Sequence, residues 1–470
     1  MQRFLFVFLF FSSLFSCAKI QPKVEERVEL MSIVFRLAES PEYNQKYAEK
    51  YIADINSHFG TYKNHPVVLF AKKIRETHGV SFDAVMSMAV RLEKKGSRFH
   101  LIKENQSGLD QRWTYEDAQK FIMLLNDFYK KSNFSKFYKS HSQDYAYVEN
   151  KFAEELKDFD EGWYSKFYGK EAEEDYKIII GYGNGGGNYG PKTNEIGAKK
   201  TVYAIMGLWK FDDNNRPVVD GKNYISTLIH EFNHSFVNYI LDEKYKDNEE
   251  LKNAGQILIE KQRKIMEDQA YSEWHTLVNE SIVRAAVINY MKDHNFTDEE
   301  IKEANIIQEF RGFLWTPQLT KLFDDYSKKR DQYKTFESFY PEIIKFFTKA
   351  SANIDLLKEN YFNNQPKIIS VEPFSNNAQN VDIKTKQIII NFSEPLDTKG
   401  HSINFGEGGK ETMPLSPNKI EYINNGKSLS LGLIDLQPDK EYEFILTGKK
   451  IRNKKGYPID NYTIKFKTSK

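Results

Sequence analysis

The chain has very little cysteine and no long uncharged apolar segment. Its 470 residues contain one cysteine, Cys17, so no disulfide can form within a single chain. The longest apolar run has roughly a dozen residues, whereas a helix needs about 20 to cross a bilayer. The formal net charge is +1, which gives no support for binding to nucleic acid or for polybasic binding to a membrane. The remaining composition is typical of a folded globular protein with enough apolar surface to form a core.

The first residues have the order of a secretion signal. Arg3 precedes a phenylalanine-rich apolar run, which ends in Leu14-Phe15-Ser16-Cys17. This ending resembles the bacterial lipobox, in which the cysteine becomes the lipidated first residue of the mature protein. The resemblance implies a lipoprotein signal peptide (1–16), a short lipidated linker (17–25) and a lipid anchor in the bacterial cell envelope, at the outer membrane. Whether the protein faces the periplasm or the outside stays open, and a secreted protein with a stray Cys17 is the alternative.

A pair of histidines lies in Ile225–Ile240, a segment whose apolar residues recur with helical spacing. The sequence His230-Glu231-x-x-His234 is an HExxH motif, and on a helix both histidines project from one face. Two imidazoles at this spacing can occupy adjacent corners of a tetrahedral zinc site. Glu231 is placed to accept a proton from a zinc-bound water. The alternative is an ordinary amphipathic helix, but no charged residue other than Glu231 occurs between Lys222 and Asp242.

A third ligand is expected from a second apolar segment, Trp274–Val287, which is predicted to be a partly buried helix. A carboxylate in such a helix is costly unless something pairs with it. Here the chain resembles the gluzincins, the thermolysin-like clan of zinc metallopeptidases, in which an Asn-Glu pair on a second helix follows HExxH. The pair here is Asn279-Glu280. The resemblance implies that His230, His234 and Glu280 bind Zn²⁺ and that Glu231 is the general base.

Two departures from the gluzincin pattern leave alternatives open. The distance from His234 to Glu280 is 46 residues, longer than in thermolysin, and would contain a charged helical insertion at 242–273. Arg284 stands where thermolysin has an aspartate that orients a ligand histidine, so Glu280 could instead form an ion pair with Arg284 one turn away. Other possible ligands are Glu260, Glu267 and Glu273. Side chains that could stabilise the transition state or orient a ligand are Tyr271, His275 and Arg284, with Tyr290 and His294 as further donors.

A glycine-rich run separates two predicted strands. Residues 177–181 indicate a buried strand, and Gly183–Gly190 contains five glycines. This run is interpreted either as a flap over the zinc cleft, because glycine allows the backbone to approach a substrate, or as the mobile tip of a hairpin. Residues 201–209 are predicted to form a strand. Resemblance to zincin-like proteases implies that an edge strand lies here and that substrate peptide adds to it.

The predicted fold has two main parts. Residues 26–364 are expected to form an α-rich α+β gluzincin-like domain, mostly helical from Glu26 to about residue 174. Residues 365–470 alternate in polarity and suit an all-β sandwich. That region resembles the bacterial Ig-like domain, with an Asn-Val-Asp sequence at 380–382 and Phe-Ser-Glu-Pro-Leu-Asp at 392–397.

The sequence therefore predicts a membrane-anchored zinc peptidase that acts on a peptide or protein substrate. The alternative is a non-catalytic binding or scaffold lipoprotein that retains a zincin-like fold and contacts protein or glycan through its Ig-like domain. The sequence does not indicate the substrate or the oligomeric state.

Overall fold

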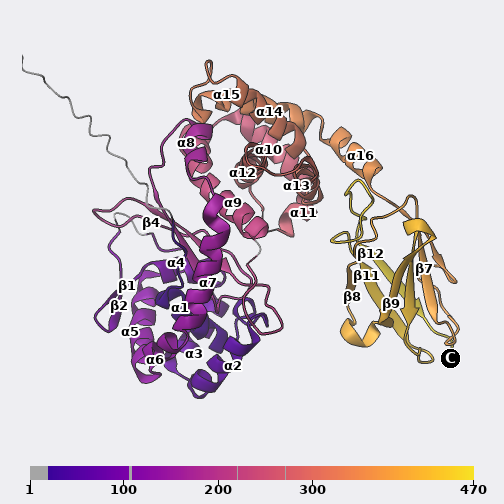
Figure 1. Cartoon of the computed structure of the whole chain (residues 1–470), viewed down its shortest axis with the longest axis horizontal. Helices are drawn as coiled ribbons and strands as arrows, with labels where there is room; N and C mark the ends of the chain where they lie inside the picture. The colour runs from indigo at the N-terminus through magenta and orange to yellow at the C-terminus, as the bar shows by residue number, and fades with distance from the viewer. Residues whose placement is uncertain (1–19, 105–107, 220, 270) are drawn as a thin grey trace, which may run out of the picture. The chain divides into compact units, whose positions relative to one another are not determined.

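The computed structural model describes residues 20–104, 108–219, 221–269 and 271–470. The predicted signal peptide and Cys17 lie outside the described residues. The chain forms two compact units, Met1–Phe236 and Val237–Lys470. Figure 1 shows that helices predominate up to α16 and that strands follow it. No helix among the described residues is long and apolar enough to cross a membrane.

The first part of the chain is mostly helical, as predicted. Its α-helices are α1 (Glu26–Leu37), α2 (Glu49–Phe59), α3 (Pro66–His78), α4 (Asp83–Val90), α5 (Tyr115–Lys131), α6 (Phe134–Ser140), α7 (Ser142–Glu155) and α8 (Gly162–Tyr168). α4 ends at Val90, within the stretch predicted to be mostly helical. A hairpin of β1 (Leu92–Lys95) and β2 (Arg98–Leu101) follows it. Gly96 turns this hairpin with φ +63°, a conformation that glycine adopts without steric cost.

A three-stranded sheet precedes the HExxH helix. Its strands are β3 (Asp175–Gly181), β4 (Lys192–Thr193) and β5 (Thr201–Gly207), in the order β3-β5-β4. β5 pairs in parallel with β3 and antiparallel with β4. The expectation that an edge strand lies at 201–209 is therefore wrong, because β5 is paired on both sides. Tyr189 extends the β4 side of the sheet through a bridge to Ile205. The glycine-rich run is consequently not the tip of a hairpin.

The HExxH segment and the insertion after it are helical. α9 spans Gly221–Tyr239 and continues as a π-helix, Ile240–Tyr245. The next helices are α10 (Glu249–Lys261), α11 (Arg263–Glu267), α12 (Trp274–Asp293), α13 (Asp298–Phe310), α14 (Thr316–Lys328), α15 (Phe336–Ala352) and α16 (Ile354–Asn364). α12 is buried around most of its circumference from Leu277 to Met291, and the buried residues include polar ones as well as apolar ones.

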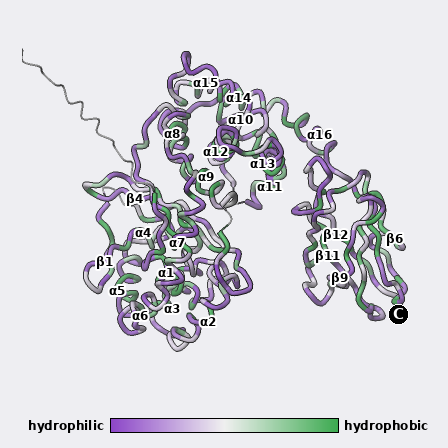
Figure 2. Tube along the Cα trace, viewed as in Figure 1, coloured by the Kyte–Doolittle hydropathy of each residue, from purple (hydrophilic) through white to green (hydrophobic). Residues whose placement is uncertain are grey.

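The C-terminal region consists of two antiparallel sheets. The strands are β6 (Ile368–Glu372), β7 (Gln387–Phe392), β8 (Ile403–Phe405), β9 (Leu415–Ile423), β10 (Ser428–Leu433), β11 (Glu441–Leu446) and β12 (Tyr462–Lys467). One sheet has the order β6-β7-β10-β9 and the other β12-β11-β8. Their buried side chains form one hydrophobic core. Figure 2 shows apolar and hydrophilic residues interspersed along these strands, as expected when one face of a sheet is buried.

Candidate metal centre

Aromatic packing fixes the rotation of α9. The ring of Phe236 stacks on Tyr168 of α8, with centroids 4.9 Å apart, and Phe232 lies 4.2 Å from the ring of Tyr176. Asn233 is fully buried; it accepts a 2.6 Å hydrogen bond from the Tyr168 hydroxyl and donates one of 2.8 Å to the Ile229 carbonyl. An amide buried in this way holds the helix in one orientation, because losing either bond would leave a buried polar group unpaired.

The HExxH residues are only partly buried, unlike the packed face of α9. His230, Glu231 and His234 are half-buried. The two Nε2 atoms lie 3.2 Å apart, and the rings are nearly perpendicular, at 82°. Two nitrogens bound to one tetrahedral zinc at about 2.0–2.1 Å would lie about 3.3 Å apart. The observed spacing fits a shared metal, and it equally fits a hydrogen bond between one protonated and one unprotonated nitrogen.

Glu280 lies on α12 and is 7% exposed. Its Oε2 accepts hydrogen bonds from Arg284 Nη2 at 2.9 Å and from the Tyr271 hydroxyl at 3.1 Å. Arg284 Nη2 also donates to the Tyr271 oxygen at 2.9 Å. The predicted ion pair between Glu280 and Arg284 is therefore present, but it is buried rather than on the surface. Two of the residues suggested as orienting groups, Tyr271 and Arg284, contact the carboxylate directly.

His230, His234 and Glu280 form a group that could hold a metal ion. One ligand atom from each residue lies within 4.8 Å of the others. The donor set of two imidazoles and one carboxylate is one that zinc accepts while keeping a position for water.

The other acidic residues considered as ligands lie elsewhere. Glu260, Glu267 and Glu273 are exposed, and the first two pair with Arg263. His275 is exposed and its Nδ1 lies 3.3 Å from the Thr276 hydroxyl. His294 stacks on Tyr290, with ring centroids 3.9 Å apart. None of these residues belongs to the metal-ligand group found among the described residues.

The glycine-rich run reaches the HExxH motif at Gly190. A Cβ atom placed on this glycine would lie 2.2 Å from Glu231 Oε2. The neighbouring Tyr189 is paired with Ile205 of β5 through hydrogen bonds of 3.0 and 2.8 Å. Sequence reasoning missed this contact, because it assigned the glycine run to a flap or a hairpin tip. The backbone at Gly190 thus passes directly beside the carboxylate predicted to be the general base.

A buried carboxylate on α1 holds the other end of the glycine-rich run. Glu29 is fully buried and accepts hydrogen bonds from the backbone N–H groups of Tyr182 and Gly183, at 2.7 and 3.0 Å. The Tyr51 hydroxyl also donates to it, at 2.8 Å. Burial raises the pKa of Glu29 to about 7, although these three donors act to lower the pKa. A single acidic residue within the apolar stretch 28–35 was the only sequence signal for this anchor.

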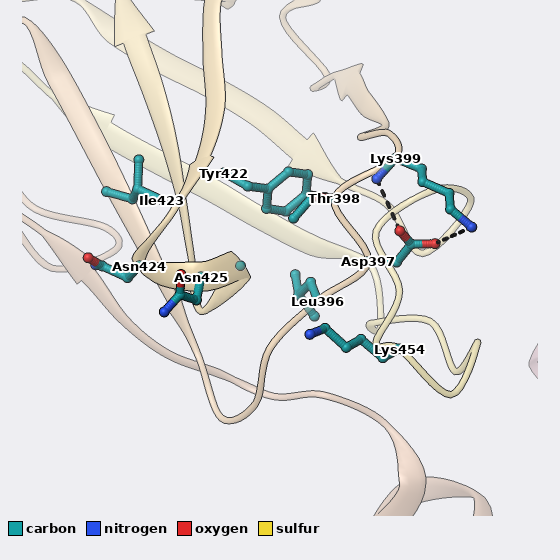
Figure 3. A pocket seen from close by; sticks show the side chains of 10 residues that line it. Leu396, Asp397, Thr398, Lys399, Tyr422, Ile423, Asn424, Asn425 and Lys454 are labelled. Atoms are coloured by element: carbon teal, nitrogen blue, oxygen red, sulfur yellow. Dashed lines mark hydrogen bonds and ion pairs between the residues drawn. The ribbon is translucent and has the colours of Figure 1, made fainter.

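The C-terminal sheets have a cavity of their own, of about 860 Å³. Figure 3 shows Asp397 and Lys399 at its rim, joined by dashed lines. The Asp397 carboxylate accepts a 3.1 Å bond from the Lys399 backbone and lies 3.9 Å from its ammonium group. Tyr422 donates its hydroxyl to the Gly400 carbonyl at 2.9 Å. These polar groups satisfy one another, and the cavity contains none of the metal-ligand group found in the described residues.

Comparison with known families matches almost the whole chain. Residues 20–346 match a family described as a domain of unknown function (DUF4932). Residues 363–468 match the bacterial Ig-like domain, which confirms the prediction for the C-terminal region. No curated protein matches the chain.

The chain is similar to several solved structures at less than 20% sequence identity. PcoC, a methionine-rich copper resistance protein from Escherichia coli, is 19% identical with a TM-score of 0.17; the match covers 22% of this chain and 98% of that one. Domains 1–6 of the surface layer protein SbsC are 18% identical with a TM-score of 0.18, over 56% of this chain and 35% of that one. The N-terminal part of SbsC is 18% identical with a TM-score of 0.17, over 56% and 61%.

The raised pKa of Glu29 predicts a pH-dependent stability. Since the folded-state pKa is about 7 and the ordinary value is 4.5, the folded protein binds more protons than the unfolded chain between these values. The stabilisation is full below about pH 4.5 and is lost as the pH rises through about 7. Between about pH 5 and pH 8, the free energy of unfolding should fall by up to about 3 kcal/mol more in the parent than in Glu29→Gln. Urea denaturation at several pH values measures this difference.

The exposed Glu76 provides the control. Glu76→Gln should keep the parental pH profile. A Glu29→Gln profile that runs parallel to the parent's would show that Glu29 does not titrate in this range.

Proposed function

The chain belongs to the family described as a domain of unknown function (DUF4932), and we propose that this member is a zinc-dependent peptidase. The grouping of His230, His234 and Glu280, with ligand atoms within 4.8 Å of one another, is the observation that carries the proposal. Three protein ligands of this type leave one coordination position for water, which is the arrangement of catalytic rather than structural zinc sites. The domain would accordingly be a gluzincin-like α+β fold.

The hydrogen bonds to Glu280 suit the role of a ligand. Tyr271 and Arg284 both donate to the same oxygen, Oε2, and so fix the orientation of the carboxylate. Partners that hold a ligating carboxylate in this way are typical of metal sites, and their loss usually weakens metal affinity.

In the proposed reaction, Glu231 moves the proton. Bound zinc would supply a Lewis acid that lowers the pKa of its water to about 7. Glu231 accepts the proton of the attacking water at its carboxylate and returns it to the nitrogen of the leaving amine. His230 and His234, on the same face of α9 as each other, hold their Nε2 atoms toward a common point.

The strand edge at Gly190 supports a peptide as substrate. Tyr189 uses its N–H and carbonyl toward Ile205, and the Pro191 carbonyl accepts from Tyr203. Because successive residues of a strand alternate in direction, the N–H and carbonyl of Gly190 point away from β5. No hydrogen bond to these two groups occurs among the described residues. An extended peptide can pair with them as an added strand, and its carbonyl carbon would then lie beside Glu231.

A binding or scaffold protein is the second candidate. The buried Glu280–Arg284 pair favours it, because a carboxylate that already has a cationic partner does not require a metal. The Ig-like domain would then provide the contact with protein or glycan.

Substitutions to glutamine separate the roles of Glu231 and Glu280. Glu231→Gln should keep the parental affinity for zinc and lose peptide hydrolysis, because the amide removes only the proton acceptor. Glu280→Gln should lower zinc affinity by about 10-fold or more, because a neutral amide is a poorer ligand. Zinc titration of both variants and the parent, followed by turnover of a peptide library, measures these effects. The exposed Glu273 gives the control Glu273→Gln. Parental zinc affinity in Glu280→Gln would remove Glu280 from the site.

A substitution at Gly190 tests the strand edge beside Glu231. Gly190→Ala should lower turnover by at least about tenfold, a transition-state loss of about 1.4 kcal/mol, while zinc affinity stays at the parental value. The added Cβ would contact Glu231 Oε2 and push the carboxylate from its position. Gly60→Ala is the matched control, since a Cβ there meets nothing within 4 Å. Equal turnover of Gly190→Ala and the parent would argue against a substrate path along this edge.

We also propose that Cys17 carries a lipid anchor and that residues 1–16 are removed. The order of charged, apolar and Leu-Phe-Ser-Cys residues supports this assignment. Intact-mass measurement of the protein from its native membrane should show a lipidated chain that begins at Cys17. A soluble product that retains the residues before Cys17 would contradict it.

A further inference from the structure

The second compact unit contains a cavity of about 1060 Å³. Its walls come from α11 and the ends of α10, α13 and α16, and both Tyr271 and Arg284 line it. The volume is slightly above the range for small-molecule pockets, about 300–1,000 Å³. Apolar side chains cover part of the wall, including Phe310, Leu314 and Phe362.

Arg284 lines this cavity and has one unsatisfied donor. Its side chain is 6% exposed, and its guanidinium lies over the ring of Phe313, 4.5 Å from the centroid. Nη1 donates to Gln308 and Nη2 to Glu280 and Tyr271. Its Nε is buried and has no hydrogen-bond partner in the described parts of the chain. A buried N–H of a charged group that lacks a partner costs free energy.

Arg311 adds a second guanidinium. It lines the same cavity, and no side chain in the described ranges forms an ion pair or a hydrogen bond with its guanidinium. Burial, and then the like charge of Arg284, lower the pKa of Arg311, while Tyr271 and Glu280 act to raise it. Of these two guanidinium groups, only that of Arg284 is bonded to the Glu280 carboxylate.

Basic side chains outnumber acidic ones in the wall: the basic residues are Lys261, Arg263, Lys264, Arg284, Arg311 and Lys358, and the acidic ones are Glu260, Asp268, Glu309 and Asp460. Glu260 pairs with Arg263, and Asp460 accepts a 2.9 Å hydrogen bond from Gln365. Burial raises the pKa of Glu309 to about 7, against a hydrogen bond with Tyr457 that lowers it, so this carboxyl group is only partly ionised near neutral pH. The wall as a whole thus has an excess of positive charge.

We propose that this cavity is an oxyanion-binding site, in which Arg311 and the Nε of Arg284 bind a carboxylate or phosphate group. The buried Nε–H of Arg284 lacks a partner, and an anionic ligand would supply one. Arg311 is exposed and has no ion-pair partner in the described ranges, so its guanidinium is accessible to the same ligand. The planar fork of a guanidinium matches the two oxygens of a carboxylate or phosphate. The apolar wall favours a ligand with an apolar body, such as the C-terminal residues of a peptide; free phosphate is the other source of the same chemistry.

The test measures binding to the full-length chain by calorimetry, in the presence of a chelator so that the result does not depend on zinc. The probes are inorganic phosphate, N-acetyl-leucyl-leucine with a free carboxylate, and the C-terminal amide of that peptide. The free acid should bind at least tenfold more tightly than the amide, and phosphate should compete with it. Binding of phosphate alone would keep the site and assign it to the free ion.

Substitutions locate the binding to Arg311. Arg311→Gln should weaken binding at least tenfold, and Arg311→Lys, which keeps the charge without the fork, should give an intermediate loss. Arg263→Gln is the control, because Arg263 lines the same cavity but pairs with Glu260 and Glu267. Circular dichroism confirms that each variant is folded. Parental affinity in Arg311→Gln, or the absence of binding by both phosphate and the free acid, would overturn the proposal.

Discussion

The buried Glu280 carboxylate constrains its surroundings in the second compact unit. α12 is surrounded by protein along most of its length, and an ionised carboxylate there requires partners. Arg284 and Tyr271 provide them, and the guanidinium in turn packs on Phe313 and bonds Gln308. Replacing such a buried pair by apolar residues is often neutral or stabilising. A role in binding therefore explains the pair better than stability does, and a metal ligand is the role that we propose.

A comparable constraint acts on α9. The Tyr168–Asn233 hydrogen bond and the stacked rings of Tyr168 and Phe236 fix one face of the helix. His230 and His234 consequently project from another face, and their Nε2 atoms approach to 3.2 Å. Gly190 then brings the edge of the sheet to Glu231, and only a residue without Cβ fits at that position without displacing the carboxylate. Glu29 holds the start of the same glycine-rich run by two backbone N–H groups.

Local patterns in the sequence predicted part of this arrangement. The spacing of apolar residues located α9 and α12, and the HExxH and Asn279-Glu280 motifs identified the three residues that the structure groups together. The alternating C-terminal pattern predicted the two sheets. The position of β5 within its sheet was predicted wrongly, because a buried run of residues does not reveal which strands pair with it. β4 has only two residues and follows a proline, so it gives no periodic signal. The contacts of Glu29 and Gly190 join residues far apart in the chain and have no counterpart in local spacing.

Zinc K-edge X-ray absorption on the zinc-loaded chain tests the central proposal most directly. We expect one tightly bound zinc with two imidazole ligands and oxygen ligands, at zinc–ligand distances of about 2.0–2.2 Å. The spectrum of His234→Ala should show the loss of one imidazole. A chain that binds no zinc, or a zinc whose spectrum does not change in His234→Ala, would contradict a metal centre at this position.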